Sequence, residues 1–116
     1  MDYEKKIVIS VSGAAEVAHC GPEALNIAKE VGREIARQGC VLTTGATSGF
    51  PHSSAQGYKE SKGMFSLGLS PAANEKEHTD LYLLPLDSCD LVIFTGFGFP
   101  VRDIMLVKSS DAMVLG

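Results

Sequence analysis

The first apolar run of the chain is Lys6-Ile-Val-Ile-Ser-Val-Ser-Gly13, which is rich in β-branched residues and ends at a glycine. A nearly unbroken apolar run of this length is typical of a strand that is covered on both faces. Such strands belong to parallel sheets, in which crossover helices cover both faces. The run therefore predicts a buried parallel strand at the start of an α/β domain.

A helix is expected next, from Pro22 to the residue before Gly39. Proline suits the first position of a helix, and glycine is the usual residue just after its end. Within these bounds, residues at helical spacing form one apolar stripe: Leu25, Ala28, Val31, Gly32 and Ile35. Gly32 would let this helix lie close to the sheet.

Strands and helices alternate along the rest of the chain. The further strands are expected at residues 40–44, 64–69, 90–95 and 111–116, and the further helices at residues 53–62 and 100–109. The last helix is expected to be largely buried. The alternation predicts an α/β, Rossmann-like three-layer sandwich with a mainly parallel sheet, in one domain over residues 1–116.

Two segments fit the alternation less well. Residues 72–80 are polar and predict an exposed loop, and Pro85 confines residues 81–86 to an edge or an irregular segment. The pattern stops at Gly116, at the tip of a strand, and a strand that needs cover on both faces seldom finishes a domain. We therefore expect this to be the N-terminal part of a longer protein, without the C-terminal elements of its fold.

Composition excludes several classes of protein. The chain has 116 residues, 45% of them hydrophobic, and a net charge of −4, which gives no basic surface for nucleic acid. The N-terminal apolar run is too short for a signal peptide or a membrane helix. Three widely spaced cysteines, without a C-x-x-C pair, are typical of reduced cytoplasmic thiols. We expect a cytoplasmic protein with neither a nucleic-acid nor a membrane partner.

Three expected strand-to-helix junctions are rich in small and hydroxyl-bearing residues: Ser12-Gly13-Ala14-Ala15, Thr43 to Gly49, and Thr95-Gly-Phe-Gly98. In a parallel sheet all three lie along the carboxyl edge, where open α/β sheets bind ligands. Small residues let backbone N–H groups approach a phosphate. The residues expected to bind a phosphate or nucleotide here are Ser12, Gly13, Gly45, Ala46, Thr47, Ser48, Gly49, Gly96 and Gly98. For any single junction, glycines that merely form turns are an equal alternative.

Arg102 is the most distinctive single residue. It lies in the first turn of the last expected helix, where a guanidinium would clamp a phosphate or carboxylate. Its spacing equally fits a surface arginine paired with Asp103 or Glu77. No G-x-G-x-x-G and no G-x-x-x-x-G-K-[ST] occurs, which disfavours a dinucleotide site or a P-loop, and no cofactor is expected.

Histidines and acidic residues give weaker signals. His52 is interpreted as a solvated loop residue, and the adjacent His19 and Cys20 are not expected to form a nucleophile pair. The acidic residues and His78 between positions 75 and 80 lack the spacing of metal ligands, so no metal site is expected.

From Lys6 to Gly116 the sequence resembles the Rossmann-like nucleotide-binding family that includes the Lonely Guy phosphoribohydrolases, formerly named lysine decarboxylases, and the molybdenum cofactor carrier proteins. Residues 44–57 resemble the family's G-G-x-x-G-[VL]-M loop, with Ala46 in place of its second glycine and Pro51 in place of its methionine. Residues 95–116 resemble its arginine helix and following strand, with Arg102 on the family's arginine and Ser110-Asp-Ala112 introducing the strand.

The resemblance implies a phosphate-binding loop, a nucleotide-like small-molecule ligand and a homodimer, which the apolar helix at 100–109 also fits. It also implies a P-G-G-x-G-T-x-x-E continuation, with the catalytic glutamate of the enzymes, beyond Gly116. Three functions stay open. The chain is a carrier or sensor that binds a phosphorylated ligand, or a phosphoribohydrolase that cleaves the N-glycosidic bond of a nucleoside 5′-monophosphate with Arg102 as a catalytic residue, or a structural fragment without a ligand. The departures at Ala46 and Pro51 favour the carrier.

Overall fold

The computed structural model describes residues 3–14 and 23–116. The strands in these ranges are β1 (Val8–Ser12), β2 (Val41–Thr44), β3 (Ser66–Ser70), β4 (Leu91–Phe94) and β5 (Ala112–Leu115). The helices are α1 (Glu23–Arg37), α2 (Phe50–Glu60) and α3 (Gly98–Ser109), with a π-helical turn, η1 (Glu77–Leu81), before β4. Four residues discussed above lie outside the described ranges: Ala15, His19, Cys20 and Pro22.

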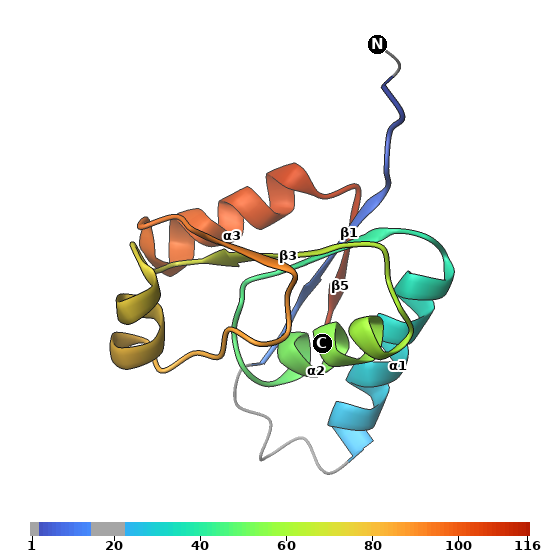
Figure 1. The fold of residues 1–116 in the computed structure, drawn as a ribbon, viewed down its shortest axis with the longest axis horizontal. Coiled ribbons are helices and arrows are strands. Elements are labelled where there is room, and N and C mark those ends of the chain that lie inside the picture. The colour runs from blue at the N-terminus through green and yellow to red at the C-terminus, as the bar shows by residue number, and fades with distance from the viewer. Residues whose placement is uncertain (1–2, 15–22) are drawn as a thin grey trace.

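The strands form one sheet in the order β4-β3-β2-β1-β5, and every neighbouring pair is parallel. α1 and α2 cover one face, while α3 lies against the other (Figure 1). This arrangement confirms the predicted Rossmann-like α/β sandwich. The chain builds the sheet outward from β1 to β4 and then returns to place β5 on the other side of β1. The order therefore reverses between β1 and β5, which is where such sheets bind ligands.

The hydrophobic core lies between the sheet and the α1–α2 pair. Its buried members are Val11, Ala28, Ile35, Leu42, Phe50, Ala55 and Tyr58. The Tyr58 hydroxyl lies 2.6 Å from the Cys40 carbonyl oxygen and accepts the Phe65 N–H at 3.1 Å, so it ties together the segments that lead into β2 and β3. No helix in the described ranges is long and apolar enough to cross a membrane.

Gly32 serves the contact between two helices, not the predicted contact with the sheet. A Cβ atom at Gly32 would lie 1.8 Å from the Ser54 carbonyl oxygen of α2, and one at Gly57 of α2 would lie 2.2 Å from the Lys29 carbonyl oxygen. The two helices therefore cross at backbone distance, each through a glycine. Beside the crossing, Glu60 forms ion pairs with Lys29 and Arg33, both at 3.2 Å.

α2 begins at Phe50, three residues before the predicted start. Gly49 precedes it with a φ of 77°, and Pro51 occupies the first turn. Proline is favoured in a first turn because its missing N–H is not needed there. The helix therefore starts directly after the glycine-containing loop.

The prediction of an exposed loop at residues 72–80 is wrong for its second half. The chain turns helically into η1, and His78 is fully buried. Its Nε2 lies 2.9 Å from the Pro85 carbonyl oxygen, and its Nδ1 lies 2.6 Å from the Ser70 hydroxyl. Because a carbonyl oxygen can only accept, Nε2 donates its hydrogen to Pro85. His78 therefore links η1 to the end of β3. The segment at residues 81–86, predicted as an edge or irregular segment, forms no strand.

The prediction of a largely buried helix at residues 100–109 is also wrong. In α3 only Arg102 and Leu106 are buried, whereas Val101, Ile104 and Val107 are 41%, 57% and 58% exposed. The helix is apolar on several sides, so its sequence does not indicate which side meets the sheet. One narrow side packs against the sheet, and the other apolar residues form a surface.

Candidate functional site

A cavity of about 210 Å³ opens at the carboxyl ends of β1 and β2, against the first half of α3. The strand ends contribute Val11, Ser12, Gly13, Gly45 and Thr47, and the helices contribute Pro51, Phe99, Arg102, Asp103 and Leu106. The cavity therefore lies beside the point where the strand order reverses. Of the described surface, this is the part that the fold itself favours for a ligand.

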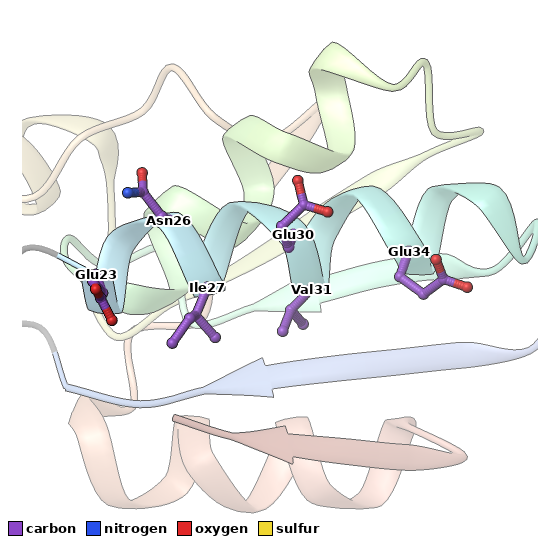
Figure 2. A pocket seen from close by; sticks show the side chains of 6 residues that line it. All are labelled: Glu23, Asn26, Ile27, Glu30, Val31 and Glu34. Carbon is purple, nitrogen blue, oxygen red and sulfur yellow. The ribbon is translucent and has the colours of Figure 1, made fainter.

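A larger groove, of about 670 Å³, runs along α1 (Figure 2). Ile27 and Val31 point to one side of the helix, and Asn26 and Glu30 point to the other. Its lining includes the three carboxylates of Glu23, Glu30 and Glu34, which would repel an anion. We therefore assign the candidate site to the smaller cavity at the strand ends.

The structure brings together five of the residues expected to contact a ligand. These residues, which come from three separate elements or loops, are Ser12, Gly13, Gly45, Thr47 and Arg102. Ala46, Ser48 and Gly49 belong to the same loop but do not line the cavity. Gly96 and Gly98 follow β4, at the far edge of the sheet, and their N–H groups donate to the carbonyl oxygens of Ala72 and Pro71. The sequence did not point to Phe99, and it suggested Asp103 only as an ion-pair partner of Arg102. The positions of both depend on how α3 is rotated.

Arg102 is 5% exposed and is held on several sides. Its Nη1 donates to the Gly45 carbonyl oxygen and, at 3.1 Å, to the Leu69 carbonyl oxygen, while its Nε donates to Asp103 at 2.9 Å. The guanidinium therefore joins the carboxyl ends of β2 and β3. The predicted pairing with Asp103 is present, but around a buried guanidinium instead of a surface one. Within the described part of the chain Nη2 has no hydrogen-bond partner, so it is available to a ligand.

Gly45 and Ala46, the two residues after β2, are both small, but the structure requires this for different reasons. A Cβ atom at Gly45 would lie 2.3 Å from Nη1 of Arg102, so only glycine leaves room for the guanidinium. Ala46 has a φ of 56°, a left-handed conformation in which glycine is unstrained, and its N–H donates to Thr44 Oγ1 at 3.1 Å. The glycine that the resembling family carries at this second position is explained by this backbone conformation.

Cys89 contacts Thr44, the last residue of β2, directly before this loop. Its Sγ lies 3.6 Å from Thr44 Oγ1, and burial raises the pKa of the thiol. The thiol is therefore less readily ionised than an ordinary cysteine, and it packs as a small apolar group.

The electrostatics of the cavity are balanced. Arg102 and Asp103 are the charged residues of its lining, and they neutralise each other. Polar groups without a protein partner supply the remaining attraction for an anion. Among the described residues, the N–H groups of Gly13 and Thr47 donate to no acceptor. The site can thus hold one anionic group through backbone amides and Nη2 of Arg102.

Two buried hydroxyl groups lie next to the site in the sheet. Ser10 and Thr43 are opposite each other in the β1–β2 pairing, and within the described residues neither hydroxyl has a hydrogen-bond partner. Because side chains alternate along a strand, Ser10 shares the sheet face of Ser12. The face under α3 is therefore polar close to the cavity. Thr43 is the first residue of the second predicted junction, whereas nothing in the sequence indicated Ser10, because serine is an ordinary residue in a strand.

The parallel sheet and the cavity beside its reversal point define a Rossmann-like α/β protein with a candidate ligand site at the carboxyl edge. The model of the SLOG cluster4 family matches residues 6–115, and the chain belongs to this family. The resemblance drawn from the sequence is thereby confirmed.

The chain is similar to proteins with known structures. It is 32% identical to the molybdenum cofactor binding protein of Rippkaea orientalis, with a TM-score of 0.81 over 97% of this chain and 63% of that one. It is 30% identical to the molybdenum cofactor carrier protein of Chlamydomonas reinhardtii, with a TM-score of 0.75 over 96% of this chain and 61% of that one. An uncharacterized protein of Archaeoglobus fulgidus is 36% identical over 110 residues, which are 95% of this chain and 64% of that protein. The chain thus spans slightly less than two thirds of the length of each.

Proposed function

We propose that this protein binds a small phosphorylated, nucleotide-like ligand at the carboxyl edge of its sheet and acts as a carrier or sensor. The proposal rests on the cavity that joins Ser12, Gly13, Gly45, Thr47 and Arg102 at the reversal point of the sheet. The similarity to the molybdenum cofactor carriers supports it. A cytoplasmic location and a homodimer remain predictions, the latter now supported by the exposed apolar residues of α3.

The ligand's phosphate is the group that this cavity fits. The N–H groups of Gly13 and Thr47, which donate to no acceptor among the described residues, flank it, and α2 begins three residues after Thr47. Backbone amides and a helix N-terminus together favour a phosphate without requiring a positive side chain. Nη2 of Arg102 adds one charge-assisted hydrogen bond.

A phosphoribohydrolase is the second candidate, because one carboxylate lines the cavity. Departure of a base leaves positive charge on the ribose, which a nearby carboxylate would stabilise. Asp103 is that carboxylate, but one of its oxygens accepts from Arg102 Nε at 2.9 Å. A carboxylate engaged in this way stabilises a developing cation less well, which favours binding over hydrolysis.

The test is calorimetric titration of the protein with AMP, ribose 5-phosphate and inorganic phosphate. Thr47→Phe should fill the cavity and abolish binding, whereas Ser109→Phe, on the exposed end of α3, should leave binding unchanged. Equal loss in both variants, or wild-type protein that binds none of the three probes, would contradict the proposal. Prolonged incubation with AMP separates the two candidates, since free adenine and ribose 5-phosphate appear only if the protein is a hydrolase.

A further inference from the structure

The cavity is too small to enclose a whole nucleotide-like ligand. Its volume is about 210 Å³, whereas pockets that enclose small-molecule ligands typically measure about 300–1,000 Å³. A phosphate and part of a sugar fill such a space. The remainder of the ligand must therefore lie at the mouth of the cavity, against residues that are both part of its lining and exposed.

Phe99 meets both conditions. It lines the cavity from the first turn of α3 and is 43% exposed. Its ring is also held in place: the guanidinium carbon of Arg102 lies over it at 5.2 Å from the ring centre, and Tyr82 meets it in a T-shaped contact at 5.3 Å. An aromatic ring fixed by two neighbours loses little freedom when a ligand covers its exposed surface.

Phe97, two residues earlier, provides the contrast. It is 63% exposed and does not line the cavity. Within the described residues it makes no aromatic or cation–π contact. Exposure alone therefore does not distinguish Phe99, whereas its position at the cavity and its two ring contacts do.

We infer that Phe99 is a stacking platform for a planar heterocycle carried by the phosphorylated ligand. The inference rests on the proposed function, because it needs the phosphate to occupy the cavity. With one face of the ring against Arg102, the exposed part of Phe99 remains for the ligand. Stacking of a nucleobase on an aromatic side chain is sequence-tolerant, so this contact selects a class of ligand, flat unsaturated rings, and not one particular base.

The experiment compares ligands with and without the ring. Wild-type protein, Phe99→Leu and Phe97→Leu are titrated with ribose 5-phosphate and with AMP, GMP and CMP. At least one nucleotide should bind wild-type protein roughly tenfold more tightly than ribose 5-phosphate does. Phe99→Leu should remove most of this advantage while the affinity for ribose 5-phosphate stays within about twofold. Phe99→Tyr should retain the advantage, and Phe97→Leu should behave as wild type.

The outcomes separate the two hypotheses. If ribose 5-phosphate binds but no nucleotide binds more tightly, or if Phe99→Leu weakens all ligands equally, the stacking role is overturned and the phosphate site stands. If neither ribose 5-phosphate nor any nucleotide binds wild-type protein, the proposed function itself fails. The melting temperature of each variant shows whether a loss of binding reflects a loss of fold.

Discussion

Arg102 has two tasks at the scale of a single residue, because one side chain joins two strand ends and faces the cavity. A lysine has no planar fork and cannot reproduce the hydrogen bonds to Gly45, Leu69 and Asp103 together. Arg102→Lys should therefore lower the free energy of unfolding by about 2–4 kcal/mol, since two buried carbonyl oxygens lose a charged donor. Urea denaturation measures the change.

The matched control for this substitution is Arg33→Lys. Arg33 makes its ion pairs with Glu30 and Glu60 at the surface, and such pairs contribute about 0–1 kcal/mol. If both substitutions cost the same, the buried guanidinium has no special structural role. Binding measurements on Arg102→Lys are informative only after this comparison, since a loosened strand end would weaken a ligand site indirectly.

At the scale of elements, the crossing of α1 and α2 sets the position of the glycine loop before α2. Gly32→Ala should destabilise the protein by about 1–3 kcal/mol, because the new methyl group meets the backbone of Ser54 and the helices must separate. Alanine also has a higher helix propensity than glycine, by about 1 kcal/mol, and the expected destabilisation is what remains after this gain. Thermal unfolding followed by circular dichroism measures the result.

Gly39→Ala is the control for that crossing. Gly39 has open space where a Cβ would lie, but its φ is 71°. Alanine there costs about 1 kcal/mol of backbone strain without any overlap. A stabilising effect of Gly32→Ala would show that the two helices can part freely, contrary to the close crossing.

Much of this element pattern was predictable from the sequence. The five strands and the outer bounds of α1 follow from local apolar runs, glycine and proline, which act over a few residues. Apart from the start of α2, the errors concern long-range contacts. His78 is buried because Ser70 and Pro85 offer it hydrogen bonds, and nothing in the charged stretch around it indicates this. The rotation of α3 depends equally on what Arg102 reaches across the sheet.

The residues of the candidate site also fall into two groups, those that the sequence predicts and those that only the structure reveals. The carboxyl-edge rule correctly brought Ser12, Gly13 and the loop after β2 together, because it follows from the parallel topology alone. It also led to the inclusion of Gly96 and Gly98, which follow the outermost strand, β4, and do not line the cavity. Phe99 lies between two predicted site residues, Gly98 and Arg102, but its proposed role follows from side-chain geometry that no local sequence pattern encodes.

For the whole molecule, stability should fall in acid. The N–H of Val8 and then the ammonium of Lys5 hold the pKa of Asp111 below its ordinary value, and Gln38 with Arg37 and Lys29 with Arg33 do the same for Glu34 and Glu60. A carboxylate with a lowered pKa in the folded state stabilises the fold above its unfolded pKa, and this stability is lost as the pH falls through the folded pKa. The melting temperature should therefore decrease below about pH 4.

Asp111→Asn tests this pH dependence. Asp111 joins the start of β5 to β1 through Val8 N–H at 2.9 Å. The variant should melt below wild type at pH 7, and the difference should shrink as the pH falls through the lowered pKa of Asp111, where the wild-type carboxyl is neutralised as well. Asp87→Asn, at an exposed position, is the control and should parallel wild type throughout. A constant difference between Asp111→Asn and wild type at all pH values would contradict the assignment.

The neutral pairing of Arg102 with Asp103 bears on how a ligand arrives. The chain has a net charge of −4 and the cavity lining has none, so no long-range field draws an anion towards the mouth. Capture then depends on short-range contacts made after a chance encounter, and added salt should not slow it, because salt screens the net negative charge that repels an anion. In the proposed carrier role, such a site would be better suited to retaining a bound ligand than to collecting it rapidly from dilute solution.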